Sequence, residues 1–227
     1  FGFEEMRVAL STRPEKRLGS DEMWDEAEEA LAGALREAGM DFHINPGEGA
    51  FYGPKIEFQV LDALRRPWQL GTLQVDYSMP ARFGLTYVRP DNTEGQPVML
   101  HRAILGSLER FMGILIEHCA GAFPAWLAPI QVAVLPVTDR THAFAQELGA
   151  RLKAEGFRAE VDLRNEKVNA KIRDAQLQKL PYMLVVGDRE AASGQVSVRH
   201  RSRGDLGAQD LGVFLDQLAL EVRTRAR

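Results

Sequence analysis

The stretch from Pro97 to Gly121 has the sequence PVMLHRAILGSLERFMGILIEHCAG. Its first part is a short apolar run that predicts a strand, and Gly106-Ser107 breaks the run. Apolar residues then recur at the spacing of one helix face, at Leu108, Phe111, Met112, Leu115 and Cys119. A helix that begins where a strand ends offers backbone N–H groups to an anion, and a guanidinium can bind two phosphate oxygens. Arg110 is therefore a candidate phosphate ligand, although on pattern alone a salt bridge beside a core helix is the commoner explanation.

The residues before this stretch alternate as strands around one clear helix. A Ser20 cap and an apolar face predict a helix from about Asp21 to Ala38, whose acidic run Asp25–Glu29 is expected to be its solvated face. The predicted strands are Phe3–Leu10, Met40–Asn45, Ile56–Leu61, Trp68–Tyr77, Thr86–Arg89 and Pro97–Ile104, the last two being joined by Asp91–Gly95. Residues 1–121 therefore predict an α+β fold, an antiparallel sheet with helices on one face.

The pattern changes after Gly121–Pro129, which contains two prolines and two aromatic residues and is expected to be a packed connector. Ile130–Val137 is apolar throughout, as in a buried strand, and helices and strands then alternate up to a closing helix at Asp210–Thr224. Gln195–His200 is expected to be an edge strand. We therefore predict an α/β domain with a mixed, mostly parallel sheet, and place the domains at residues 1–125 and 126–227.

Composition excludes several classes of protein. The 227 residues contain no apolar run near the ~20 residues of a membrane span. The N-terminus lacks the pattern of a signal peptide, and its start in mid-strand without Met suggests a fragment. The single Cys119 excludes an internal disulfide, fits a cytoplasmic protein and is expected to be a core residue. The net charge of −4 argues against nonspecific binding of nucleic acid.

Five blocks of sequence, in order along the chain, resemble the class II aminoacyl-tRNA synthetases, and the threonyl enzymes in particular. HRAILGSLER with its helix is similar to motif 3 of that class. The other blocks are STRPEKRLGSDEMW (Ser11–Trp24), NPGEGAFYGPKIEF (Asn45–Phe58), WQLGTLQVDYSMPARFGLTYV (Trp68–Val88) and GAFPAWLAPIQV (Gly121–Val132). The resemblance implies part of a class II catalytic core followed by an anticodon-binding domain. It also implies ATP-dependent activation of threonine and its transfer to tRNA(Thr), by a cytoplasmic homodimer with no membrane or DNA partner.

The resemblance assigns several residues to an ATP and threonine site, with Mg²⁺ accompanying ATP. Arg110 corresponds to the motif 3 arginine that binds the γ-phosphate. Arg110 and Lys55 are the two expected catalytic cations. Tyr52, Gln69, Thr72, Gln74 and Ser107 are expected to bind ATP or threonine. The alternation of the strand places Thr72 and Gln74 on one face and Gln69 on the other, unless a bulge intervenes.

His101 lies in an otherwise apolar strand, where a lone histidine is usually a satisfied core residue. The resemblance implies a Zn²⁺ site of one Cys and two His, with His101 as the last ligand. The other two ligands, like motifs 1 and 2, are expected upstream of Phe1. We therefore expect the isolated chain to bind zinc weakly or not at all, and to be inactive alone.

The most specific stretch of the C-terminal half is DLRNEKVNAKIRDAQLQKLPYMLVVGDRE (Asp162–Glu190). By resemblance, Asn165, Glu190 and Arg199 match anticodon-reading positions. The charge of Lys167 suits phosphate or base, although on pattern alone each of these residues is an ordinary polar loop residue. Residues 131–227 hold 16 Lys and Arg against 13 Asp and Glu, so RNA is electrostatically easier to bind there. The basic run Arg199–Arg203 lies on RNA backbone or forms a charged sheet edge.

The main alternative is a noncatalytic RNA-binding or regulatory protein that keeps the synthetase fold. Upstream sequence that encodes the missing zinc ligands and the motif 2 arginine would favour the enzyme. An unrelated α/β nucleotide-binding domain would need a glycine-rich phosphate loop after a strand, and the sequence contains none.

Overall fold

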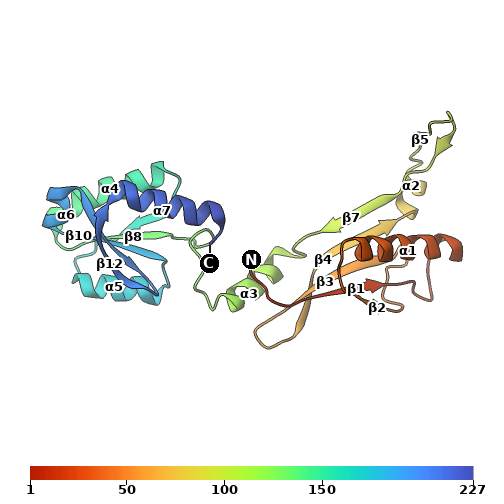
Figure 1. Ribbon diagram of the computed structural model, residues 1–227, viewed down its shortest axis with the longest axis horizontal. Helices are drawn as coiled ribbons and strands as arrows, with labels where there is room; N and C mark the ends of the chain where they lie inside the picture. The colour runs from red at the N-terminus through yellow and green to blue at the C-terminus, as the bar shows by residue number, and fades with distance from the viewer. Residues whose placement is uncertain (227) are drawn as a thin grey trace. The chain divides into compact units, whose positions relative to one another are not determined.

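The computed structural model describes residues 1–226, and the chain divides into two compact units, Phe1–His118 and the residues from Cys119 onward (Figure 1). The sequence predicted the domain boundary after residue 125, whereas the two units divide after His118. Residues of the connector are hydrogen-bonded to the second unit, where the Arg201 guanidinium donates to the backbone oxygens of Ala122 and Phe123.

The first unit is built on a five-stranded sheet with helices. The strand order is β2 (His43–Asn45), β1 (Met6–Ser11), β3 (Lys55–Leu61), β4 (Pro67–Asp76) and β7 (Met99–Ala103). All neighbours are antiparallel except β1 and β2, which are parallel. The helices are α1 (Asp21–Glu37), α2 (Ser78–Arg82) and α3 (Leu108–His118). The predicted antiparallel α+β fold is therefore confirmed, with one parallel pair at an edge.

Helix α1 forms where its cap and its apolar face predict it. The Ser20 hydroxyl accepts a hydrogen bond from the N–H of Met23, and Asp21 and Glu22 occupy the first turn, where carboxylates complement the helix dipole. Its buried face packs against one side of the sheet, in a cluster of Ala27, Leu31, Ala32 and Leu35 with Val8, Leu10, Ile56 and Val75. Because strand side chains alternate, the opposite side of β1, β3 and β4 is left without this helix.

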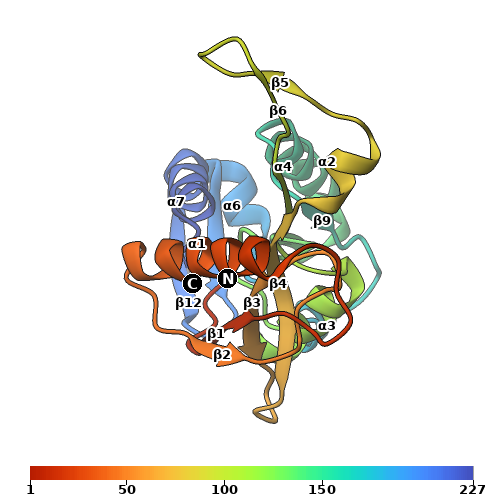
Figure 2. The ribbon, with the colours of Figure 1, turned by 90° about the vertical axis from the view of Figure 1, so that its right-hand side faces the viewer.

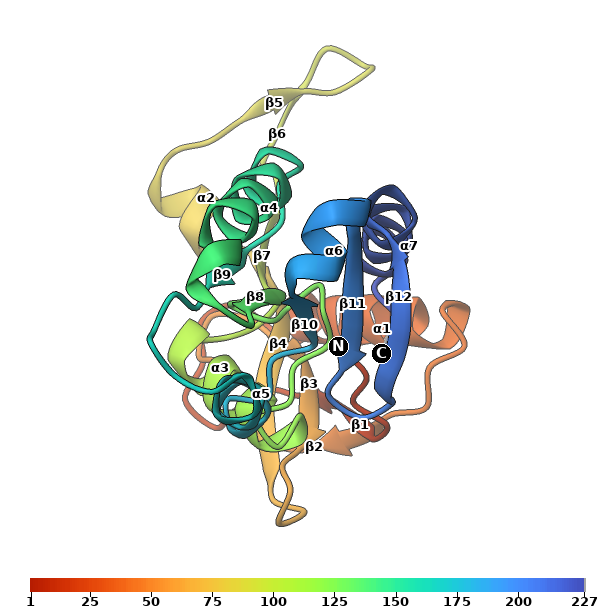
Figure 3. The ribbon, with the colours of Figure 1, turned by 90° about the vertical axis from the view of Figure 1, so that its left-hand side faces the viewer.

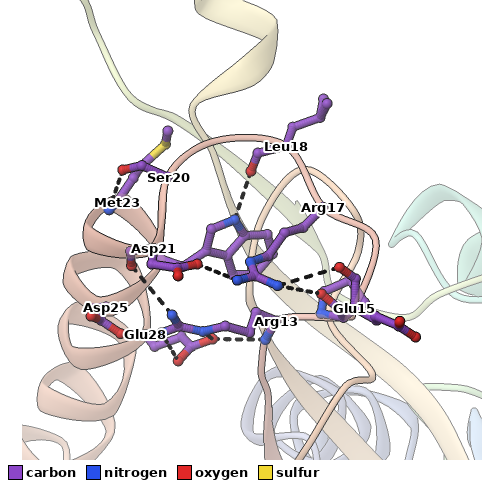
Figure 4. A network of polar contacts seen from close by, with 11 residues as sticks. Arg13, Glu15, Arg17, Leu18, Ser20, Asp21, Met23, Asp25 and Glu28 are labelled. Atoms are coloured by element: carbon purple, nitrogen blue, oxygen red, sulfur yellow. Dashed lines mark hydrogen bonds and ion pairs between the residues drawn. The ribbon is translucent and has the colours of Figure 1, made fainter.

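A polar network ties α1 to the loop after β1 (Figure 4). The Arg13 guanidinium binds Glu28 through two nitrogens, at 3.1 and 2.8 Å, and also pairs with Asp25. Arg17 pairs with Asp21 at the start of the helix. The acidic run is therefore only partly a solvated face, since the side chain of Glu28 is 18% exposed and holds the loop against the helix.

The last two strands predicted for this unit do not pair with each other. Strand β5 (Tyr87–Val88) pairs with β6 (Glu94–Gly95) in a separate two-stranded sheet, and β7 pairs with β4. The hairpin closes early because Asn92 adopts a positive φ and the Asp91 carboxylate accepts from the N–H and hydroxyl of Thr93. The hairpin consequently projects beyond α2, away from the main sheet (Figure 2).

The second unit contains a mixed five-stranded sheet. The order is β12 (Gly204–Asp210), β11 (Gln195–His200), β10 (Tyr182–Val186), β8 (Val132–Pro136) and β9 (Ala159–Val161). β10–β8 and β8–β9 are parallel, whereas the other two pairs are antiparallel. The mixed sheet is confirmed, but β11 is not an edge strand because β12 lies beside it (Figure 3). Two glycines and few β-formers give β12 little strand signal in the sequence.

Helices cover both faces of this sheet (Figure 1). On one face, α4 (His142–Ala154), preceded by a 3₁₀ turn at Asp139–Thr141, and α7 (Leu211–Thr224) pack on Val132, Val134 and Leu184. On the other, α5 (Val168–Leu177) packs through Ala175 on Ala133, Leu135 and Met183. A short helix, α6 (Asp188–Ser193), follows β10.

The predicted packed connector is confirmed by its hydrogen bonds. The buried amide of Gln131 donates to the backbone oxygen of Ala125 at 2.8 Å and accepts from the N–H of Arg158 at 2.9 Å. The Arg158 guanidinium donates to the backbone oxygens of Ala128 and Trp126. The connector is thus fixed to the start of β8 by polar side chains as well as by apolar packing.

We expect Gln131→Leu to lower the free energy of unfolding of the second unit by about 1–3 kcal/mol, because it leaves the partly buried N–H of Arg158 without its acceptor. Urea denaturation measures the change. Gln176→Leu, on the exposed side of α5, is the matched control. Equal midpoints for the two variants would contradict the assigned role of Gln131.

Candidate functional site

A polar face spans four strands of the first unit, on the side of the sheet away from α1. The backbone register aligns Ser11, Lys55, Gln74 and His101 in one row across β1, β3, β4 and β7. Glu57 and Thr72 lie opposite each other in the next row. These residues alternate with Ile56, Leu73 and Val75, which pack under α1. The sheet therefore gathers four of the sequence-predicted residues, Lys55, Thr72, Gln74 and His101, on one surface.

A β-bulge brings Gln69 to the same face. Phe58 pairs with Gly71 and Gln59 with Gln69, so Leu70 is an extra residue in β4. The side-chain amide of Gln69 donates to the hydroxyl of Thr72 at 2.8 Å. A regular strand would place these two side chains on opposite faces, and the bulge removes that difficulty.

Tyr52 and Gln74 are held together by a close approach of the backbone. The Tyr52 hydroxyl donates to the amide oxygen of Gln74 at 3.0 Å, and the amide nitrogen donates to the backbone oxygen of Gly53 at 3.3 Å. A Cβ on Gly53 would lie 1.7 Å from the backbone oxygen of Val75, so a larger residue does not fit. Gln74 is consequently buried and its amide has a fixed orientation.

The ammonium group of Lys55 is paired rather than free. Its Nζ lies 2.5 Å from Oε1 of Glu57, a buried carboxylate two residues along β3. Sequence reasoning did not select Glu57, although its position on the same face of the strand was a usable signal. The pair fixes Lys55 on the polar face, beside its cross-strand neighbour Gln74.

His101 contacts a buried carboxylate. Its Nε2 lies 2.8 Å from Oδ2 of Asp76, whose other oxygen accepts from the N–H groups of Ser78 and Met79 at the start of α2. Burial raises the pKa of Asp76, but the hydrogen bonds from Met79, His101 and Ser78 more than offset it and leave the pKa below its usual value. A cavity of about 250 Å³ opens beside the pair, lined partly by Tyr52 and Arg82.

Residues 1–226 do not by themselves contain a cluster of metal ligands. No group of three His, Cys, Asp or Glu side chains in this range is placed to hold a metal ion. His101 has one carboxylate partner, and a protein zinc site needs at least three protein ligands.

Arg110 lies at the edge of the sheet and not in the polar row. The Ser107 hydroxyl caps α3 by accepting from the N–H of Arg110 at 3.1 Å. The guanidinium donates to the backbone oxygen of Gln69 at 3.2 Å and stacks 5.7 Å from the centre of the Trp68 ring. Both contacts are made by an exposed side chain.

Asp62 organises the turn beneath Trp68, and sequence reasoning missed it. Its buried carboxylate accepts from the Trp68 indole at 2.8 Å, from the Arg66 guanidinium at 2.6 Å and from the N–H groups of Leu64 and Arg66. Burial raises the pKa of Asp62, but these hydrogen bonds lower it overall, to about 2. The indole that contacts Arg110 is thereby fixed.

In the second unit, the predicted RNA-binding residues lie around the carboxyl end of the parallel strands. Asn165 and Lys167 occupy the loop after β9, and Glu190 lies in α6, directly after β10. The side chains of Asn165 and Lys167 make no hydrogen bond within residues 1–226. This leaves both of them available to a ligand.

Glu190 and Arg199 are partly engaged in the fold. The Glu190 carboxylate accepts from the N–H of Gly187 and from the Ser197 hydroxyl, both at 2.9 Å. Burial raises the pKa of Glu190, but these bonds lower it below its usual value. Arg199 lies two residues beyond Ser197 on the same face of β11 and pairs with Asp205 at 3.2 Å, while its buried Nε has no hydrogen-bond partner.

Two arginines of the basic run Arg199–Arg203 have structural roles. Arg201 binds the connector, and the Arg203 guanidinium donates to the hydroxyl of Tyr182 at 2.8 Å. That hydroxyl donates to Glu221 of α7. Because β12 covers β11, the run is not a sheet edge, and that interpretation was wrong. Contact of its arginines with RNA backbone stays a prediction.

Comparison with known protein families accounts for both units. A family model described as the tRNA synthetase class II core domain (G, H, P, S and T) matches residues 1–119. The chain belongs to the class II tRNA synthetase family. A second model, described as an anticodon binding domain, matches residues 131–223. The family resemblance predicted from five sequence blocks is confirmed.

Several curated relatives of this class II synthetase chain are named threonine–tRNA ligase. The chain is 57% identical to the threonine–tRNA ligase of Halorhodospira halophila over its whole length, and spans 36% of that protein. The RNA binding domain of the threonyl-tRNA synthetase of Cryptosporidium parvum has 40% identity and a TM-score of 0.89, over 97% of this chain and 55% of the other. A putative threonyl-tRNA synthetase of Aeropyrum pernix has 30% identity and a TM-score of 0.77, over 99% and 56%.

The chain spans about a third of the length of the curated relatives that it matches. Among the described residues, every helix is too short or too polar to cross a membrane.

We expect Asp62→Asn to lower the urea midpoint of the first unit at pH 7. The pKa of Asp62 in the fold lies below the ~3.9 of an unfolded aspartate, so its stabilisation is present above about pH 4 and is lost as the pH falls toward 2. The gap between variant and wild type should therefore close over that range. Asp41→Asn, at an exposed position, is the control. A gap that stays constant from pH 7 to pH 2.5 would contradict the assignment.

Proposed function

We propose that the chain is part of an enzyme that activates threonine with ATP and transfers it to tRNA(Thr). The observation that carries the proposal is its identity of 55–57% with threonine–tRNA ligases over nearly its whole length. The polar face of the first unit supports it, because the face brings cations, amides and hydroxyls from several strands together.

The first unit would supply positioned cations and hydrogen-bonding groups. Activation of an amino acid is an in-line displacement at phosphorus, in which positioning and charge stabilisation do most of the work. Lys55, fixed by Glu57, would face the charge that develops on the phosphate, and Mg²⁺ would accompany ATP. Tyr52, Gln69, Thr72 and Gln74 form two hydrogen-bonded pairs whose polar atoms would bind ATP or threonine.

Arg110 would bind the terminal phosphate of ATP, with Ser107 beside it. Its guanidinium contacts a backbone oxygen and an aromatic ring, and phosphate oxygens would replace these contacts with a charged, two-point interaction. The exposed position at the start of α3 leaves the long side chain free to reach a phosphate outside the sheet edge.

His101 would be one of three protein ligands of a Zn²⁺ ion in the complete enzyme. Its contact with Asp76 resembles the carboxylate–histidine pairs that orient histidines in metal sites. The other ligands would come from outside this chain. We further propose a homodimer that works in the cytoplasm, where its tRNA substrate is used.

The second unit would read the anticodon. The side-chain amide of Asn165 and the carboxylate of Glu190 suit base edges, whereas Lys167 and Arg199 suit phosphates or bases. The free side chains after β9 support this role.

We expect Arg110→Ala to reduce ATP–pyrophosphate exchange more than tenfold in the protein expressed from its complete gene, because it removes a cation that faces transition-state charge. Arg36→Ala, which removes an exposed arginine of α1, is the matched control. Near-normal exchange in Arg110→Ala would refute the role of Arg110. Absence of exchange in the wild type would instead favour a noncatalytic RNA-binding protein.

We expect Asn165→Ala to weaken tRNA charging while threonine-dependent exchange continues, since adenylate formation does not require the anticodon. Initial rates of both reactions on the same preparation provide the measurement. Gln146→Ala, at an exposed position of α4, removes a side-chain amide elsewhere and is the control. An equal loss in both assays would contradict an anticodon role.

A further inference from the structure

A buried lysine, Lys171, lies where two neighbouring strands of the second unit are followed by helices on opposite faces of the sheet. Strands β8 and β9 are adjacent and parallel, but the chain leaves β8 for α4 on one face and β9 for α5 on the other. A crevice forms at the carboxyl ends of two such strands, and α/β proteins commonly bind ligands there. Here a cavity of about 230 Å³ is lined in part by Lys171 of α5. The Nζ of Lys171 donates to the backbone oxygen of Pro136 at 3.2 Å and of Asp162 at 3.0 Å.

Lys171 is only 2% exposed, so its ammonium cannot reach a ligand on the surface. Burial of a charge is costly, and two backbone oxygens offset that cost only in part. A methionine would fill a similar volume without the charge. What the ammonium adds is a fixed link between the end of β8, the end of β9 and α5.

A second link holds the same loop on its outer side. The Arg164 guanidinium binds the Asp162 carboxylate through two nitrogens, at 2.9 and 2.7 Å, and lies 2.9 Å from Oδ2 of Asp174 in α5. Hydrogen bonds from Arg164, acting against burial, lower the pKa of Asp162. Asp162 is therefore held by its backbone oxygen and by its side chain.

The loop that these two links hold is Asp162–Lys167, which carries Asn165 and Lys167. Their side chains make no hydrogen bond with the rest of the described chain, whereas the backbone on both sides is fixed. The Lys167 backbone oxygen accepts from the N–H groups of Ala170 and Lys171. Free side chains on a fixed backbone form a surface that loses little conformational entropy when a ligand binds.

We propose that Lys171 and Arg164 are positioning residues for RNA recognition, which hold the loop Asp162–Lys167 in the conformation that presents Asn165 and Lys167. The inference rests on the proposed RNA-binding function of the second unit and adds a role for residues that do not touch RNA. The anticodon loop is the ligand, because unpaired bases are what exposed amides and cations on protein loops recognise.

The test measures binding of a fluorescent anticodon stem–loop of tRNA(Thr) to the 227-residue chain by anisotropy, over a series of salt concentrations. Lys171→Met should weaken binding about tenfold. The slope of log Kd against log salt should stay unchanged, because Lys171 does not contact phosphate. Lys153→Met, at an exposed position of α4, removes the same charge and should change affinity less than threefold. Lys167→Met should lower the slope by about one phosphate contact if Lys167 binds the backbone.

Asp174→Asn tests the outer link without changing the buried lysine. Removal of a negative charge favours RNA binding in general, whereas a loosened Arg164 disfavours it. We expect Asp174→Asn to weaken RNA binding two- to fivefold. The loss of a negative charge alone would instead strengthen it. Because Asp174 is partly exposed, this variant remains informative if Lys171→Met fails to fold, as judged by circular dichroism.

Wild-type affinity in Lys171→Met would overturn the inference, and so would a reduced salt slope, which would mean that Lys171 binds phosphate directly. Tighter binding by Asp174→Asn would overturn the role of the outer link. Failure of the wild-type chain to bind the stem–loop is a different result, since it removes the proposed function of the second unit and the positioning role with it.

Discussion

The pairing of β3 with β4, interrupted by one extra residue at Leu70, decides which side chains form the polar face of the first unit. Beyond the bulge, Thr72, Gln74 and Asp76 lie on the face of Lys55 and Glu57. Before the bulge, the side chain of Gln69 lies on this polar face, whereas Trp68 lies on the opposite face, where α1 packs. A strand without the bulge would divide these residues between the two faces. Gly71 leaves room for the backbone at the bulge, because a Cβ there would lie 3.0 Å from the Phe58 ring.

Much of this arrangement could be predicted from local sequence, but not all of it. Period-two alternation placed Thr72 and Gln74 together, whereas only the family resemblance placed Lys55 near them. The bulge could be named as a condition but not predicted, because it depends on the pairing of two strands. The same limit explains β12, where polar residues and glycines form a strand only because β11 lies beside them. Where hydrophobic periodicity was strong, as in α1 and β8, the elements agree closely with the sequence.

The buried carboxylates were the least predictable part of the candidate site. Glu57, Asp62 and Asp76 are each buried and stabilised by donors: a lysine two residues away on the same strand, a hairpin turn with an indole, and a histidine 25 residues away. A carboxylate in such a place must be satisfied, because a buried unpaired charge is strongly unfavourable. Sequence shows the residue type but not the burial, so these residues looked like ordinary polar positions of strands and turns.

Two basic residues show how burial separates roles that sequence cannot. Arg110 and Lys171 both lie within one turn of a helix start, after a strand and a loop, and either could be assigned to a phosphate by pattern. Arg110 is exposed, and its partners are a backbone oxygen and a ring face, which a phosphate can replace. Lys171 is enclosed, and its partners are the ends of two strands, which nothing can replace without opening the sheet. The first is therefore suited to bind a ligand, and the second to hold the loop that does.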